Sequence, residues 1–177
     1  LLSFPTRRAS DLLGLYLGAP HGLDAPWLRS RVYRRPLEPG RPARWGLAMS
    51  LGAGTAVLVF GLSLLGPTLP AEHATSAAGW AWRGALASFY GGIVEEVGCR
   101  LLPVSLFVWL LARSHRNVAL PWMFVVAIVL AALLFGAGHL PAVFAITATP
   151  ASWLIGKIVL LNAVVGTGTG VLFWKYG

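Results

Sequence analysis

Two acidic residues and an arginine stand together in a stretch that is otherwise apolar. Glu95 and Glu96 follow two glycines, and Arg100 comes four residues after Glu96. Residues four apart share one face of a helix, so Glu96 and Arg100 are expected to form a supporting ion pair. Glu95 points about 100° away from that pair. It is therefore the candidate general base, a carboxylate that can take a proton from water.

A histidine in a later apolar segment could complete this site. His139 ends the stretch 119–138 and has Gly136 and Gly138 beside it, whereas the other three histidines lie in more polar segments. A neutral imidazole can orient or polarise a water molecule that a carboxylate holds. Glu95 and His139 are thus the candidate catalytic residues, and the same two would be the ligands of a metal ion if one were bound.

Small residues at helical spacing predict where helices pack closely. Gly91 and Gly98 line the helix face that carries Glu95, and a second stripe recurs every four residues in the last apolar segment, as Asn162, Gly166 and Gly170. Small side chains let neighbouring helices approach each other. We expect all five positions to be packing positions, with Asn162 joining helices through its amide.

The composition places these residues in a membrane. Of 177 residues, 56% are hydrophobic and 11% are charged, about half the charged fraction of a soluble domain. This balance excludes a disordered chain, a disulfide-stapled miniprotein (there is one cysteine) and an ordinary soluble enzyme. The net charge of +8 comes largely from an arginine-rich arm before the first apolar run. Such an arm is typical of the cytoplasmic flank of a membrane span, so no nucleic-acid partner is expected.

The apolar stretches predict an all-α polytopic bundle of transmembrane helices with about four spans, at 45–66, 82–112, 119–138 and 153–174. A span needs about 20 residues. The second span must then carry Glu95, Glu96 and Arg100. Each such charge costs roughly 2.5–3.5 kcal/mol at the centre of a membrane helix, so three together indicate a function.

Three parts of the chain can be distinguished. Residues 1–12 resemble a translated sequencing adaptor and are predicted to be non-native. Residues 13–44 are rich in Pro, Gly and Arg and are predicted to form an irregular or partly amphipathic cytoplasmic lead-in. Residues 45–177 form the transmembrane domain, with the motifs within 84–177.

The distribution of basic residues predicts the orientation in the membrane. Lys and Arg are concentrated in 13–44, in the connection 113–118 and at Lys175, and are absent from 67–80 and 140–152. The positive-inside rule puts the arm and the 113–118 connection on the cytoplasmic side. Arg83 and Lys157 do not follow this pattern. The expected location is a cell membrane, the plasma membrane of a prokaryote, crossed several times.

The two motifs together resemble those of a protease family. Glu95, Glu96 and Arg100 match E-E-x-x-x-R, and Phe135 with His139 matches F-x-x-x-H. In this order, on separate membrane segments, they resemble the CPBP family of CAAX prenyl proteases and bacteriocin-processing enzymes, which are intramembrane proteases. The resemblance implies that Glu95 and His139 activate water to hydrolyse a peptide bond.

The resemblance also predicts a missing piece. The family's third motif, H-x-x-x-N or H-x-x-x-D, stabilises the oxyanion and is not found before Gly177. Loss of one oxyanion donor costs about 10²–10³ in rate, so this 177-residue chain is expected to be an inactive fragment.

Cofactor and function each keep an alternative. The family is often described as metalloproteases, but the H-E-x-x-H spacing is absent and a catalytic zinc needs three protein ligands. No cofactor is favoured, with a divalent metal such as zinc as the alternative.

The expected partners are membrane lipid and a membrane-associated peptide or protein substrate. The alternative function is a small transporter or proton relay in which Glu95 and His139 are protonation sites; a non-catalytic scaffold is a third.

Overall fold

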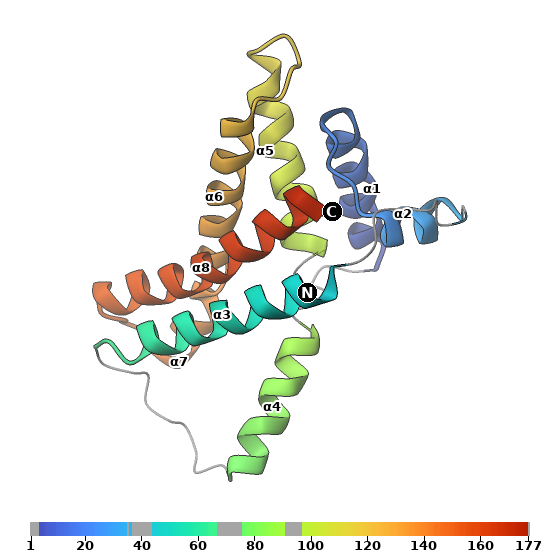
Figure 1. The fold of residues 1–177 in the computed structure, drawn as a ribbon. Coiled ribbons are helices and arrows are strands. Elements are labelled where there is room, and N and C mark those ends of the chain that lie inside the picture. The colour runs from blue at the N-terminus through green and yellow to red at the C-terminus, as the bar shows by residue number, and fades with distance from the viewer. Residues whose placement is uncertain (1–3, 35, 37–43, 67–75, 91–96, 177) are drawn as a thin grey trace.

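The computed structural model describes residues 4–34, 36, 44–66, 76–90 and 97–176, and these form helices and turns without a strand (Figure 1). The helices are α1 (Phe4–Gly18), the 3₁₀ turn η1 (Ala19–His21), α2 (Pro26–Tyr33), α3 (Trp45–Ser63), α4 (Ala77–Tyr90), the π-helical turn η3 (Val97–Leu101), α5 (Leu102–Arg113), α6 (Pro121–Ala137), α7 (Leu140–Ile146) and α8 (Ser152–Tyr176). The predicted all-α class is therefore confirmed for the described residues.

Three helical stretches of the described chain are long and apolar enough to cross a membrane. They are Trp45–Ser63, Pro121–Ile146 (α6 continued by α7) and Ser152–Tyr176. The second predicted span, 82–112, is not one continuous helix among the described residues. It is represented by α4, by η3 and by α5, and residues 91–96 between them lie outside the described residues.

Pro103 gives a local reason for the irregular turn at η3. It lies in the first turn of α5, where its missing N–H is tolerated. In a continuous α-helix the proline ring would clash with the carbonyl of the residue four positions earlier, Cys99. The wider π-helical turn at Val97–Leu101 relieves that clash. The irregularity therefore begins beside Arg100, in the first motif.

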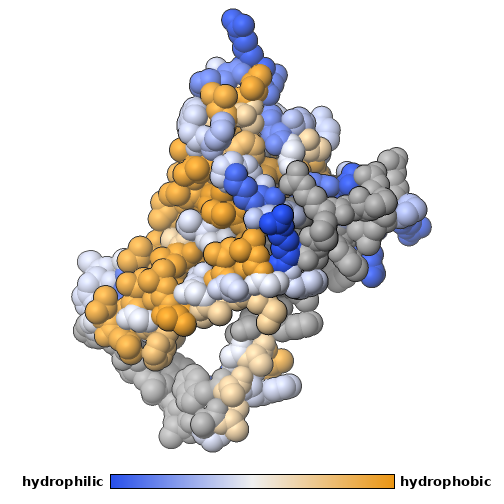
Figure 2. All heavy atoms as spheres, in the orientation of Figure 1, coloured by the Kyte–Doolittle hydropathy of each residue, from blue (hydrophilic) through white to orange (hydrophobic). Residues whose placement is uncertain are grey.

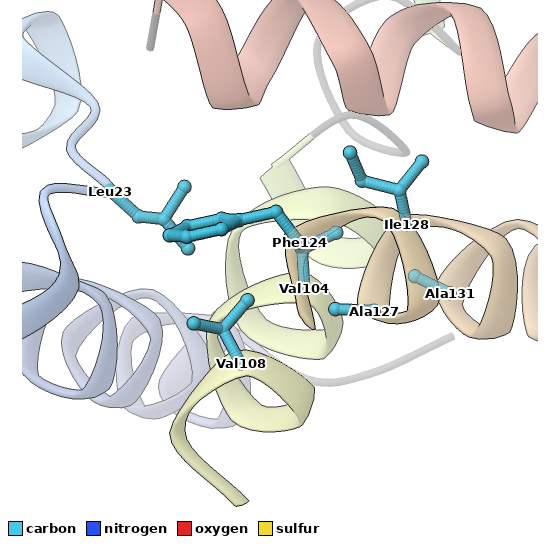
Figure 3. Close-up of a cluster of buried hydrophobic side chains, with 7 residues drawn as sticks. All are labelled: Leu23, Val104, Val108, Phe124, Ala127, Ile128 and Ala131. Carbon is cyan, nitrogen blue, oxygen red and sulfur yellow. The ribbon is translucent and has the colours of Figure 1, made fainter. Parts of the chain in front are cut away.

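The core lies where α5, α6 and α8 meet, and α6 and α8 form the most extensive helix pair. Figure 3 shows its central cluster of buried side chains, which are Leu23, Val104, Val108, Phe124, Ala127, Ile128 and Ala131. Leu23 comes from the lead-in and packs with side chains of α5 and α6. The lead-in is thus joined to the helical bundle through its own apolar residue.

The lead-in is more regular than predicted, because α1 and α2 are helices. The prolines Pro20 and Pro26 do not interrupt them, since each stands in the first turn of a short helix, the position where proline is best tolerated. α1 packs against α5 and η3, and a Cβ on Gly14 would lie 2.8 Å from Leu101 Cγ. α1 also continues across the predicted boundary at residue 12; the assignment of 1–12 as non-native stays a prediction.

Two contacts place the basic helix ends together. The guanidinium of Arg44, which precedes α3, lies 5.3 Å from the ring centroid of Tyr176, the last residue of α8. Phe124, in the first turns of α6, stacks on Trp174 with centroids 5.0 Å apart. The start of α3, the start of α6 and the end of α8 therefore lie at one end of the bundle.

Lys157 has a structural reason to depart from the predicted charge pattern. Its Nζ donates a hydrogen bond of 2.7 Å to the carbonyl oxygen of Ser63, the last residue of α3. A cation at the C-terminus of a helix satisfies an unpaired carbonyl and interacts favourably with the helix dipole. The hydrogen bond of Lys157 therefore connects the end of α3 to the first turns of α8.

Replacing Gly136 with alanine is expected to force α6 away from α8. A Cβ at this position would lie 2.5 Å from the carbonyl oxygen of Val159 and 3.0 Å from its Cα. The backbone of α8 cannot rotate away as a side chain can, so we expect a loss of about 2–3 kcal/mol of unfolding free energy. Denaturant titration of the purified protein in detergent measures it.

Gly156→Ala is the matched control for that substitution. No described atom lies within 4 Å of the Cβ position at Gly156, and alanine favours the helix over glycine by up to about 1 kcal/mol. This variant should be as stable as the parent or slightly more so. Equal unfolding midpoints for the Gly136 and Gly156 variants would contradict the close approach of α6 and α8.

Candidate active site

Arg100 is the buried charge around which the site is built. Its side chain is only 2% exposed, and its Nε donates a 2.6 Å hydrogen bond to Oγ1 of Thr169 in α8. The guanidinium carbon lies 4.5 Å from the ring centroid of Phe135 in α6. A buried cation requires such compensating contacts, and a ring face beneath an arginine supplies one of them. Arg100 therefore ties η3 to both α6 and α8.

Phe135 connects this arginine to the candidate catalytic histidine. Its ring is 8% exposed, and it meets the imidazole of His139 edge to face, with centroids 4.7 Å apart and planes at 81°. The structure thus brings together Arg100 of the first motif with Phe135 and His139 of the second. The phenylalanine of F-x-x-x-H is itself the link between the two motifs.

The hydrogen bond of His139 determines which ring nitrogen is available. Nδ1 lies 2.8 Å from the carbonyl oxygen of Phe135. A carbonyl oxygen can only accept, so Nδ1 carries the proton in the neutral ring and Nε2 is left with its lone pair. The side chain is half-buried. A held imidazole with an accepting Nε2 suits the orientation of a water molecule or the acceptance of a proton.

Three predicted site residues, Gly91, Glu95 and Glu96, lie outside the described residues. The Glu96–Arg100 ion pair and the juxtaposition of Glu95 with His139 therefore stay predictions. Within the described part of the chain, no three His, Cys, Asp or Glu side chains lie close enough together to hold a metal ion. Of the candidate metal ligands, only His139 is among the described residues.

The predicted packing residues differ in their surroundings. A Cβ on Gly166 would lie 3.0 Å from Cα of Ala132, and one on Gly170 would lie 2.7 Å from Cγ2 of Ile128, so α8 meets α6 along this stripe. At Gly98 no described atom lies within 4 Å of the Cβ position. The side-chain amide of Asn162 donates to the carbonyl of Ile158 at 2.9 Å, a bond within α8 itself rather than between helices.

Thr169 belongs to the site but was not among the residues predicted from the sequence. Its hydroxyl donates to the carbonyl of Val165 at 3.1 Å, so its lone pairs are left to accept from Arg100. A signal was available, because a hydroxyl residue in an apolar, glycine-spaced helix is a suitable acceptor for a buried cation. Its partner, 69 residues earlier, could not be identified from spacing.

Thr169→Val is expected to destabilise the fold by about 1.5–3 kcal/mol, because valine has nearly the same shape but leaves the charged Nε donor of Arg100 without this acceptor. Thr169→Ser keeps the hydroxyl and should restore most of the loss. Denaturant titration in detergent compares the three proteins. A loss with serine but none with valine would show that the methyl group, not the hydrogen bond, matters.

Comparison with known proteins identifies the family. The sequence model of the family described as type II CAAX prenyl endopeptidase Rce1-like matches residues 77–177, more than half of the chain. The chain belongs to the Rce1-like family. This confirms the resemblance to CAAX prenyl proteases that the two motifs predicted. No curated protein and no solved structure matches the chain.

The Rce1-like match covers α4 through α8 and so includes every described residue of the candidate site. Membership in the Rce1-like family supports a CAAX-type intramembrane protease at the level of the family, and with it a location in a membrane and a membrane-associated protein as substrate. The helices α1, α2 and α3 precede the matched region.

Proposed function

We propose that this protein is an intramembrane endopeptidase that hydrolyses a peptide bond of a prenylated, membrane-associated protein or peptide. The observation that carries the proposal is the contact chain from Arg100 through Phe135 to His139. These contacts bring residues of the two motifs together in space, and Glu95 precedes Arg100 by five residues in the sequence. Membership in the Rce1-like family supports the same class of reaction.

The proposed reaction uses a glutamate and a histidine to activate water. Glu95 takes a proton from the water molecule, while Nε2 of His139 accepts a hydrogen bond that orients it. The resulting hydroxide attacks the carbonyl carbon of the scissile bond, and the tetrahedral intermediate collapses as the protonated Glu95 gives its proton to the leaving amine. Glu96 and Arg100 hold Glu95 in place, and Thr169 fixes Arg100 through the described hydrogen bond.

We expect the activity to survive removal of divalent metal ions. Glu95, Glu96 and His139 form a weak ligand set, since zinc in hydrolases prefers sites with three protein ligands of suitable geometry. The protein should cleave its substrate at an unchanged rate after dialysis against EDTA and 1,10-phenanthroline. A loss of activity that zinc restores would instead favour the metal-dependent alternative, with Glu95 and His139 as ligands.

We further propose four membrane crossings, in which α4 and α5 together contribute the second. The basic arm, the 113–118 connection and Lys175 then share the cytoplasmic side. The contacts of Arg44 with Tyr176 and of Phe124 with Trp174 support this arrangement, because they gather the basic helix ends. Cysteine accessibility labelling at Ser114 and at Thr149 tests it, since the two positions should react from opposite sides.

The function is tested with the full-length natural protein that contains these residues, reconstituted in liposomes. A farnesylated CAAX peptide should lose its last three residues, as followed by mass spectrometry, while the unprenylated peptide remains intact. Proton flux under a pH gradient, read with an enclosed pH-sensitive dye, should match that of empty liposomes. Flux without cleavage would support the proton-relay alternative, and the absence of both would support a scaffold.

A further inference from the structure

We propose that the turn between α5 and α6 binds the phosphate headgroup of an anionic phospholipid. This turn contains an open hollow of about 360 Å³, lined by Ser114, His115, Arg116, Val118 and Leu120. It lies at the far end of α5 from η3 and is separate from the candidate active site. The inference does not depend on the proposed protease activity.

The lining of the hollow has the two-sided chemistry of a lipid. The guanidinium of Arg116 provides hydrogen-bond donors and positive charge on one part, beside the imidazole of His115. Val118 and Leu120, which are 58% and 36% exposed, provide an apolar part. A phosphate ester suits the first part, because arginine binds phosphate oxygens through paired N–H donors. The glycerol backbone and upper acyl chain suit the second, which a free phosphate would leave uncovered.

The turn is held in shape before any ligand arrives. The backbone N–H groups of His115 and Asn117 both donate to the carbonyl of Ala112, each at 2.9 Å. Arg116 and Asn117 have φ angles of 55° and 63°, in the left-handed region that tight turns require. The hydroxyl of Ser114 donates to the carbonyl of Leu111 at 2.7 Å. Such a preorganised turn loses little conformational freedom on binding.

Aromatic rings contact two basic side chains of this turn. The guanidinium of Arg113 lies 4.6 Å from the ring centroid of Trp109, and His115 meets Trp122 edge to face with centroids 5.8 Å apart. Tryptophan is enriched at the level of the lipid headgroups. These ring contacts therefore suit the basic groups to the depth at which the phosphates of a bilayer lie.

Among the described residues, no acidic side chain neutralises this turn. The sequence contains no Asp or Glu after Glu96, so α5, α6 and α8 are free of carboxylates. On the packed lead-in, Asp24 is held by Arg29 at 3.2 Å. Asp11 precedes Gly14, which packs at Leu101 at the opposite end of α5. The positive charges of Arg113 and Arg116 are thus available to an anionic ligand.

The position of the turn matches a membrane surface. Figure 2 shows hydrophilic atoms gathered at the tip of the α5–α6 hairpin and a hydrophobic surface along the helices below it. α6 continued by α7 (Pro121–Ile146) is long and apolar enough to cross a membrane, so we expect the first residues of α6 to lie at the interface. Basic residues at such a level attract anionic lipids.

Native mass spectrometry of the full-length protein tests the proposal, with phosphatidylglycerol and phosphatidylcholine as the two probes. The wild-type protein should bind phosphatidylglycerol about tenfold more tightly than phosphatidylcholine. Arg113→Gln and Arg116→Gln should each weaken phosphatidylglycerol binding about fivefold. Arg83→Gln, which removes the same charge from the exposed surface of α4, should leave it unchanged.

Three outcomes would overturn the proposal. Equal affinity for the two lipids, or an equal effect of the Arg83 and Arg116 substitutions, would show that no specific site exists. Full displacement of the lipid by inorganic phosphate at the same concentration would assign the hollow to a soluble anion. In support of a lipid, Leu120→Ser should weaken phosphatidylglycerol binding while leaving any phosphate binding intact.

Discussion

Replacing His139 with alanine is expected to lower the rate of peptide cleavage by about 10²–10⁴, the range that one acid–base group contributes. The bond from Nδ1 to the carbonyl of Phe135 leaves Nε2 as the acceptor that is available to a water molecule, and alanine removes it. The effect should appear in kcat, because the imidazole acts on the water molecule rather than on the bound peptide. Steady-state kinetics with a farnesylated peptide in liposomes measure it.

His21→Ala serves as the control for this substitution. His21 lies in η1 of the lead-in, before the region that matches the Rce1-like family, so its removal should leave kcat within about twofold. The His139 variant should also keep the helical content of the parent, and its free energy of unfolding should lie within about 1 kcal/mol of the parent's. This comparison separates a catalytic defect from a folding defect. Retention of more than one tenth of the parent kcat would contradict the role of His139.

Replacing Glu95 with glutamine is expected to abolish cleavage, with a loss of at least about 10³ in kcat. Glutamine has the shape of glutamate but cannot take a proton from water, so the nucleophile is not formed. Glu96→Gln should have a smaller effect, about tenfold, since Arg100 keeps its contacts with Thr169 and Phe135. Single-turnover cleavage at excess protein measures both variants without interference from product release.

The comparison of the two glutamates assigns their roles. If Glu96→Gln removes all activity and Glu95→Gln does not, the base and the supporting residue are exchanged. Glu38→Gln, in the lead-in, controls for the removal of one negative charge. The proton-relay alternative makes a different prediction. In liposomes, the wild-type protein would then conduct protons without cleaving the peptide, and Glu95→Gln would suppress this proton flux.

Much of this protein could be predicted from the sequence because a membrane imposes strong constraints. Long stretches without charge predict helices, since an unsatisfied backbone is costly in lipid. The observed bounds of α3 and α8 lie within a few residues of the predicted spans 45–66 and 153–174. Charges that interrupt such stretches are costly enough to be informative. Arg100 and His139 can be recognised in the sequence for this reason, and in the structure both contact the ring of Phe135.

What could not be predicted depends on contacts between distant parts of the chain. The lead-in packs on the bundle because apolar residues such as Leu23 are buried against α5 and α6, and local composition does not indicate that partner. Hydropathy predicts the span 82–112 as one segment because it does not register the effect of Pro103 on the preceding turn. Thr169 gains its role only from the approach of Arg100.

The fastening of α3 by Lys157 has a consequence for biogenesis. Ser63 and Lys157 are 94 residues apart, and at about 5–20 residues per second a ribosome needs about 5–20 s to synthesise the segment between them. α3 has no buried residue and finds its main packing partner in α8. During translation we therefore expect α3 to remain in the bilayer without this partner. Its nineteen residues are all uncharged, so α3 can remain in lipid on its own. Once α8 is synthesised, the two helices can pack together.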